Sequence, residues 1–236
     1  MTGVGLAHEV SEATLRRLPA DVSVAVSVHA DDADGWLRRA RAGRREGLLT
    51  LPLEPADPAR VDPGPGALGV RRDPAAREAD LTGLLGGGTG YVGFAADAGA
   101  FAAVPDAFAP VAAELAGRGL ALLELGGSRL AGVAKAGGLP YAGTGPALDE
   151  APSAARVDLA LGALEAAALR DGSAVGWARG YPVALERVAA WAETLPGKGI
   201  ALVPVSAQLP EPGADSGGAA TAGRGATAAG ASASTR

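Results

Sequence analysis

Short apolar runs alternate with longer amphipathic stretches along the first 209 residues of the chain. Several short runs are almost continuously apolar, which is typical of strands buried on both faces of a parallel sheet. We expect strands at 22–28, 47–51, 91–95, 120–125, 139–142, 174–178 and 200–205. The longer stretches predict helices near 8–18, 33–43, 74–85, 106–117, 128–136, 153–170 and 183–195. This order predicts an α/β layer fold, either a (β/α) barrel or a doubly wound sheet.

The alternation lacks a strand at its amino end. The chain opens on MTGVGLAHEVSEATL, a glycine turn followed by a helix, with no strand in front of it. Seven strands remain where a closed barrel would have another. We therefore expect a barrel of about seven strands with its first strand missing. Such a barrel would have a seam of unpaired backbone groups next to 22–28 and 200–205.

The composition changes from about Pro210 onward. The segment PEPGADSGGAATAGRGATAAGASASTR is rich in Gly, Ala, Ser and Thr and contains no large apolar residue. It cannot bury enough apolar surface to offset the entropy that it would lose on ordering. We therefore predict a folded domain of residues 1–209 and a disordered tail of residues 210–236.

Charge and composition exclude several classes of function. The chain has no cysteine and only two histidines, so disulfides and cysteine zinc sites are excluded. Its net charge is −5, and its arginine pairs alternate with acids, so we expect no nucleic-acid partner. No apolar run reaches the roughly 20 residues that span a bilayer, and the amino end shows no signal peptide. The oligomeric state stays open.

Polar residues follow several of the expected strands, and working residues of parallel α/β folds cluster at these carboxyl ends. We expect Glu54, Asp97 and Glu124 to converge there, where carboxylates can act as general acid and base or as metal ligands, and Asp97 and Glu124 are the catalytic candidates. The candidate substrate-binding residues near the same edge are His29, Glu54, Asp62, Trp177 and Arg179. The alternative is that each acid is solvated at the rim or caps the next helix.

The sequence resembles the divergent polysaccharide deacetylase family from about Thr2 to Leu209. The resemblance is carried, in family order, by LPADVSVAVSVHA (18–30), LPLEP with DPGP (51–65), GYVGF (90–94) and GIALVPVSA (199–207). It implies a (β/α) barrel that hydrolyses carbon–nitrogen amide bonds of acetylated polysaccharides. It also implies a divalent metal such as zinc, which polarises the carbonyl and activates water. The compartment that it implies is the periplasm or the cell envelope.

The residues to which the resemblance assigns this chemistry differ in the present chain. The paired aspartates of the family correspond to Thr2 and Gly3, three of its histidines to Arg45, Asp97 and Arg179, and its Asp-Ser pair to Glu124-Leu125. Two former histidine positions thus carry permanent cations, which repel a divalent ion. We therefore predict no metal ligand and no cofactor in this chain.

Three interpretations of the function follow. In the first, the protein is a pseudoenzyme linked to carbohydrate metabolism that has lost deacetylase activity and binds a glycan or a cell-envelope partner. In the second, it is an active hydrolase of acetylated polysaccharides that uses the remaining strand-end acids. In the third, it is a truncated or mis-started reading frame without selected activity. We favour the first.

Deleting residues 211–236 should leave the melting temperature and the far-UV circular dichroism of the folded domain unchanged, because the tail has no apolar surface to bury. A fall of several degrees in the melting temperature would show instead that the tail docks on the domain.

Overall fold

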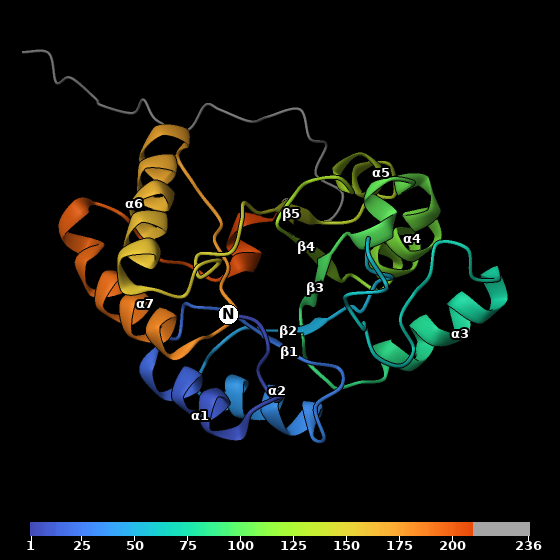
Figure 1. The fold of residues 1–236 in the computed structure, drawn as a ribbon, viewed down its shortest axis with the longest axis horizontal. Helices are drawn as coiled ribbons and strands as arrows, with labels where there is room; N and C mark the ends of the chain where they lie inside the picture. Colours follow the sequence, from blue (N-terminus) through green and yellow to red (C-terminus); the bar gives the residue numbers. More distant parts are fainter. Residues whose placement is uncertain (210–236) are drawn as a thin grey trace, which may run out of the picture.

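A parallel sheet of five strands lies at the centre of the computed structural model, which describes residues 1–209 (Figure 1). The strands are β1 (Val24–Val26), β2 (Gly47–Thr50), β3 (Gly93–Asp97), β4 (Ala121–Leu125) and β5 (Tyr141–Gly143). They lie in sequence order, and each neighbouring pair is parallel. The tail predicted for residues 210–236 lies outside the described residues.

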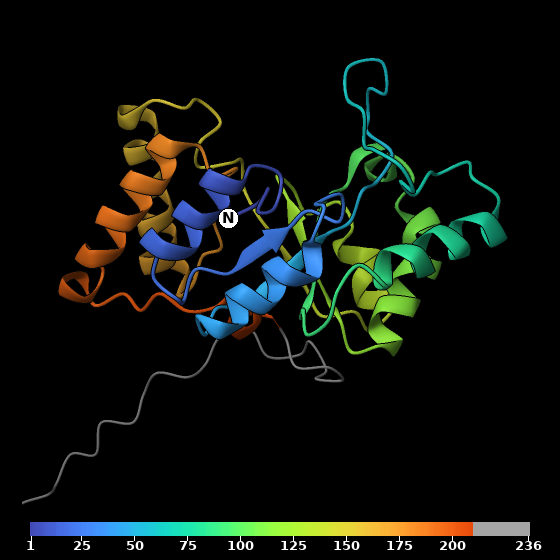
Figure 2. The same ribbon diagram turned by 90° about the horizontal axis from the view of Figure 1, so that it is seen from below.

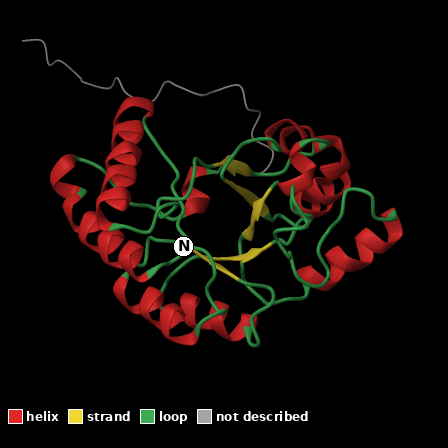
Figure 3. Cartoon of the chain, viewed as in Figure 1, coloured by secondary structure: helices red, strands yellow, loops and turns green. Residues whose placement is uncertain are grey.

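The α-helices surround the sheet and follow the predicted alternation (Figure 3). They are α1 (His8–Arg17), α2 (Ala33–Ala42), α3 (Pro74–Leu85), α4 (Ala109–Gly117), α5 (Ala131–Ala136), α6 (Ala154–Asp171) and α7 (Pro182–Thr194). Short 3₁₀ helices lie at Gly99–Ala102, Pro105–Phe108, Pro196–Lys198 and Val205–Gln208. Each predicted helix is present, although the one expected at 106–117 begins as a 3₁₀ turn before α4. No helix of the described part is long and apolar enough to cross a bilayer.

Alternating residues of each strand enter different apolar clusters, because successive side chains point to opposite faces of a sheet. The outer face packs against α2 to α5 through Val24, Val26, Leu49, Phe94 and Leu122. The inner face presents Ala25, Leu48, Ala95 and Leu123, which are joined by Val205. A third cluster joins α1, α6 and α7 through Leu18, Val157, Leu161, Leu185 and Val188.

Two of the predicted strands, at 174–178 and 200–205, are wrong. Both segments are irregular in the structure, and the second ends in the 3₁₀ helix at Val205–Gln208. Val175 and Val205 still pack against the inner face of the sheet, which explains the apolar pattern of both segments. The sheet therefore contains five strands instead of the expected seven, and a barrel is not confirmed.

Residues 1–4 lie along the free edge of β1. Val4 forms a parallel bridge with Val26, and its N–H donates to the Ala25 carbonyl at 3.3 Å. The Ala25 N–H donates to the Met1 carbonyl at 2.7 Å, and the Ser27 N–H to the Val4 carbonyl at 2.8 Å. The edge of β1 is thus paired from Ala25 onward, so the predicted seam does not extend along this part of the strand.

Arg45 is buried at the amino end of β2, and its side chain binds the carboxyl end of α1. Its guanidinium donates to the carbonyls of Leu15 (3.2 Å), Leu18 (2.8 Å), Pro19 (2.5 Å) and Val22 (2.8 Å). The last turn of α1 and the following loop have free carbonyls, and Arg45 satisfies them. The resemblance assigns Arg45 to a histidine position, but the structure places it at the edge opposite the carboxyl strand ends.

Replacing Arg45 by Met should lower the free energy of unfolding by about 3–5 kcal/mol, because several partly buried carbonyls would lose their donor. Arg16→Met is the matched control: Arg16 is exposed on the same helix end, and its loss should cost less than about 0.5 kcal/mol. Urea denaturation of both variants measures the difference. Equal stabilities would show that Arg45 does not hold this junction together.

Candidate functional site

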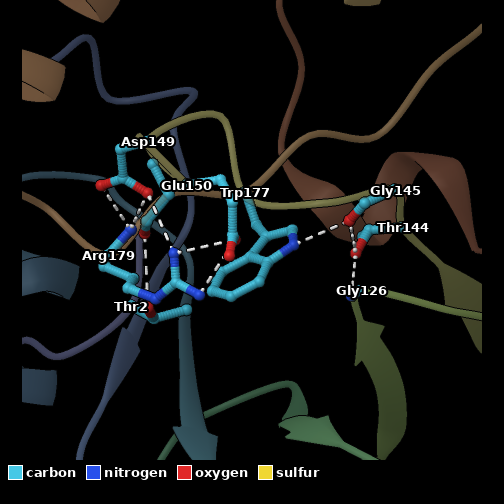
Figure 4. A network of polar contacts seen from close by, with 9 residues as sticks. Thr2, Gly126, Thr144, Gly145, Asp149, Glu150, Trp177 and Arg179 are labelled. Atoms are coloured by element: carbon cyan, nitrogen blue, oxygen red, sulfur yellow. Dashed lines mark hydrogen bonds and ion pairs between the residues drawn. The ribbon is translucent and has the colours of Figure 1, made fainter. Parts of the chain in front are cut away.

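The loop after β5 meets the segment after α6 in a network of polar contacts (Figure 4). The Leu148 N–H donates to the Trp177 carbonyl at 2.8 Å. The next residue, Asp149, is fully buried, and its two carboxylate oxygens lie 3.0 and 2.9 Å from the Arg179 N–H nitrogen. These contacts fix the backbone on either side of Trp177 and Arg179.

The Arg179 guanidinium lies over the Trp177 ring, 5.0 Å from the ring centroid. Its two terminal nitrogens donate to one carboxylate oxygen of Glu150, at 3.3 and 3.2 Å. The buried carboxylate of Asp149 lies 3.9 Å from the same guanidinium. The Arg179 side chain is 40% exposed, so the group is held in place yet open to solvent. A cation over an indole face is favourable because the ring face is electron-rich.

Trp177 connects this group to the ends of β4 and β5. Its indole N–H donates to the Gly145 carbonyl at 2.9 Å. The neighbouring Thr144 hydroxyl donates to the Glu124 carbonyl at 3.0 Å and accepts from the Gly126 N–H at 2.9 Å. The ring orientation is therefore set by loops that leave the carboxyl end of the sheet.

Thr2 joins the network from the amino end of the chain. Its N–H and its hydroxyl both donate to the Ala178 carbonyl, at 2.8 and 3.3 Å. The resemblance assigns Thr2 to an aspartate position of the family and Arg179 to a histidine position. In the structure these two positions lie beside each other. Of the predicted site residues, the structure thus brings Trp177 and Arg179 together.

Glu124 is buried on the outer face of the sheet. Its carboxylate accepts from the N–H groups of Arg129 (2.7 Å) and Leu130 (2.8 Å) and from the Tyr141 hydroxyl (2.8 Å). Burial, and then the hydrogen bond with Glu124, raises the pKa of the Tyr141 phenol above its usual value. The carboxylate thus fastens the start of α5 to β4 and β5.

Asp97 ends β3 on the other face of the sheet. In the ladder Ala96 lies opposite Glu124, and Asp97 lies opposite Leu125. Because neighbouring residues of a strand alternate between faces, the Asp97 side chain projects inward while that of Glu124 projects outward. Asp97 is exposed and accepts from the Gly99 N–H at 2.8 Å. The structure therefore does not bring these two carboxylates together.

Of the remaining three predicted residues, Glu54 and Asp62 belong to the long connection between β2 and α3, which projects from the body in Figure 2. His29 lies in the loop between β1 and α2 and contacts this connection. The His29 Nε2 atom lies 3.1 Å from the Pro65 carbonyl oxygen. Asp62 accepts from the Gly64 N–H at 2.9 Å, and Glu54 accepts from the Val70 N–H at 2.9 Å. These contacts shape the connection and lie outside the Trp177–Arg179 network.

Sequence reasoning missed Asp149 and Glu150, which hold Arg179 in place. The available signal was the Leu-Asp-Glu triplet at 148–150, a pair of acids soon after a short apolar strand. That signal is weak, because such acids are common in loops. Their function depends on Arg179, which lies about thirty residues further along the chain.

The metal that the resemblance implies does not fit the residues of this site. Zinc and similar ions take neutral imidazoles and carboxylates as ligands. Here Asp149 and Glu150 already bind Arg179, whose guanidinium stays protonated. Within residues 1–209, no three His, Cys, Asp or Glu side chains form a group that could hold a metal ion.

Comparisons with known proteins assign this chain to a family. The sequence model of the family described as "Divergent polysaccharide deacetylase" matches residues 1–209. The crystal structure of an uncharacterized protein from Agrobacterium tumefaciens C58 superposes with a TM-score of 0.84 at 30% identity, over 88% of this chain and 86% of that chain. Comparison with curated proteins gives no match. Because the match spans the whole described part of the molecule, the chain belongs to the divergent polysaccharide deacetylase family.

Proposed function

We propose that this protein binds glycans at the Trp177–Arg179 group and does not hydrolyse their acetamido bonds. The observation that carries the proposal is the stacked guanidinium, held over the indole ring by Asp149 and Glu150 and half open to solvent. The family membership supplies the class of ligand, acetylated polysaccharides. Glycan binding is also how we link this protein to carbohydrate metabolism.

The chemistry of the group suits a sugar. A guanidinium presents several N–H donors in one plane, and the hydroxyls and acetamido carbonyls of a sugar ring accept from such donors. An indole is a rigid apolar surface with little entropy to lose on binding, and the C–H face of a pyranose is apolar as well. Glu150, which lies beside Arg179, adds a carboxylate that can accept from sugar hydroxyls.

Hydrolysis would need a group that activates water, either a metal or a free general base. At the carboxyl strand ends, the Glu124 carboxylate is buried and accepts three hydrogen bonds. Arg179 is a cation at a position where the resemblance implies a metal-binding histidine. The positive charge of Arg179 and the hydrogen-bonded carboxylate of Glu124 both favour binding of a glycan without its hydrolysis.

Replacing Trp177 or Arg179 by Ala should weaken the binding of N-acetylated oligosaccharides at least tenfold, which corresponds to about 1.4 kcal/mol. Titration calorimetry with chito-oligosaccharides measures the affinity. Arg187→Ala is the matched control, because Arg187 is a partly exposed arginine paired with an acid, Asp158, away from this site. Unchanged affinity in both site variants would contradict the binding site, and release of acetate by the unmodified chain would contradict the loss of hydrolysis.

Replacing Glu124 by Gln should lower the free energy of unfolding by about 1–3 kcal/mol, because an amide would face backbone donors that now meet a carboxylate. The affinity for N-acetylated oligosaccharides should stay within twofold. Asp97→Asn is the isosteric control at an exposed position and should change stability by less than about 1 kcal/mol. A Glu124→Gln variant of unchanged stability that loses a measurable acetate release would instead assign Glu124 to catalysis.

A further inference from the structure

An apolar cavity of about 490 Å³ lies between the sheet and the helices α6 and α7. Protein interiors contain few voids larger than a water molecule, and a cavity of roughly 150 Å³ already takes a benzene ring. The present cavity is about three times larger, so it can hold an apolar group of ligand size. Its main apolar lining residues are Ala25, Leu48 and Leu123 on the sheet side and Leu164, Val188 and Leu195 on the helix side.

The cavity opens to solvent at the carboxyl end of α6. Leu169 and Val203 both line it, and they are 64% and 37% exposed. Gly172 and Ser173, which follow α6, line the same region and are exposed as well. Exposed large apolar side chains at the entrance of an apolar cavity are typical of a ligand site.

The same cavity reaches the Trp177–Arg179 group. Residues 173–178 line it along their length, and Trp177 is both a wall of the cavity and the ring that Arg179 covers. A chain segment spans at most about 3.6 Å per residue, so this wall extends at most roughly 18 Å from the entrance to the group. A ligand that binds at Trp177 therefore has an apolar cavity directly beside it.

The charged side chains of the wall do not call for a charged ligand. Glu165 lines the cavity, but its carboxylate accepts from the Trp191 indole N–H at 3.1 Å and from the Lys198 ammonium at 2.8 Å. The other acid of the wall, Asp21, is exposed to solvent. The buried part of the wall thus favours an uncharged apolar group, because burial of a charge without a partner is costly.

The backbone of the wall offers hydrogen-bond donors. Within residues 1–209, the amides of Ala201, Leu202 and Val203 donate no hydrogen bond. The amides of residues 174–178 donate none either within this part of the chain. A carbonyl oxygen can accept from such a group. An apolar chain that begins with a carbonyl therefore matches the wall better than a pure hydrocarbon does.

We propose that this cavity binds the acyl chain of an acylated glycan whose sugar lies on the Trp177–Arg179 group. The inference rests on the proposed function, and it narrows the ligand to glycans that carry a chain longer than acetyl. The chain enters the cavity beside Trp177, and the walls cover it with apolar side chains. Each methylene group that leaves water strengthens binding, so the affinity rises with chain length until the cavity is full.

The test compares di-N-acetylchitobiose with an analogue in which one acetyl group is replaced by octanoyl. Titration calorimetry with the full chain should give an affinity at least a hundredfold higher for the octanoyl ligand, because its longer chain leaves water. The octanoyl ligand alone should slow hydrogen exchange at the amides of residues 201–203 at least tenfold. Equal affinities of the two ligands would overturn the inference.

Filling the cavity from α6 tests where the chain binds. Ala168 lines the cavity, so Ala168→Phe should abolish the gain from the octanoyl chain and leave the affinity for di-N-acetylchitobiose within twofold. Ala166→Phe is the matched control, because Ala166 is exposed on the same helix and lies outside the cavity wall. A gain that persists in both variants would overturn the inference. If Ala168→Phe does not fold, the hydrogen exchange of the unmodified protein decides.

Arg179→Ala separates this inference from the proposed function. The variant should weaken the binding of both ligands by the same factor, so the ratio of their affinities should stay within twofold. A di-N-acetylchitobiose affinity that Arg179→Ala leaves unchanged would contradict the sugar site. Normal binding of di-N-acetylchitobiose without any gain from the octanoyl chain would contradict the cavity alone.

Discussion

A strand of a parallel sheet needs a neighbour for its backbone groups, and this requirement determines the shape of the molecule. β2, β3 and β4 have a strand on each side, and apolar residues of all three, such as Leu49, Phe94 and Leu122, are fully buried. At the free edge of β1 the four residues 1–4 supply the missing partners from Ala25 onward. Within residues 1–209 the amides of 174–178 and 201–203 donate no hydrogen bond, and there an apolar segment stays irregular with a cavity beside it. The architecture follows from which strands find neighbours.

The strand-end acids of this protein are engaged by backbone amides. Glu124 accepts from two N–H groups of the α5 start, Asp149 from Arg179, and Glu54 from Val70. A carboxylate that accepts such bonds is held in one rotamer. Acidic side chains at the carboxyl ends of parallel strands often act in catalysis in α/β folds. In this protein they fix the loops instead. Arg179 has the same effect on Asp149 and Glu150: it binds both acids, which would otherwise be free to bind another cation.

The sequence predicts the periodic features of the fold and misses those that depend on distant partners. All of the predicted helices are present, because spacing and start signals such as Asp73-Pro74 are local, and the Asp73 carboxylate does cap α3. The strands at 174–178 and 200–205 failed because an apolar run records burial, whereas a strand also needs a neighbour. The expected convergence of Asp97 and Glu124 failed for another reason. In the ladder Glu124 pairs with Ala96 and not with Asp97, so the two carboxylates point to opposite faces of the sheet. The sequence alone does not give the register between two strands, so it could not predict this. The proximity of Trp177 and Arg179 is predictable from the sequence, because they lie two residues apart in one segment.

The proposed glycan site shares one segment with the apolar cavity that lies between the sheet and the helices α6 and α7. Trp177 and Ala178 line the cavity, while the Ala178 carbonyl accepts from Thr2 and the Arg179 N–H donates to Asp149. Since the amides of residues 174–178 donate no hydrogen bond within residues 1–209, the hydrogen bonds of Trp177, Ala178 and Arg179 and the packing of Val175 on the sheet hold this backbone, and with it the indole and the guanidinium.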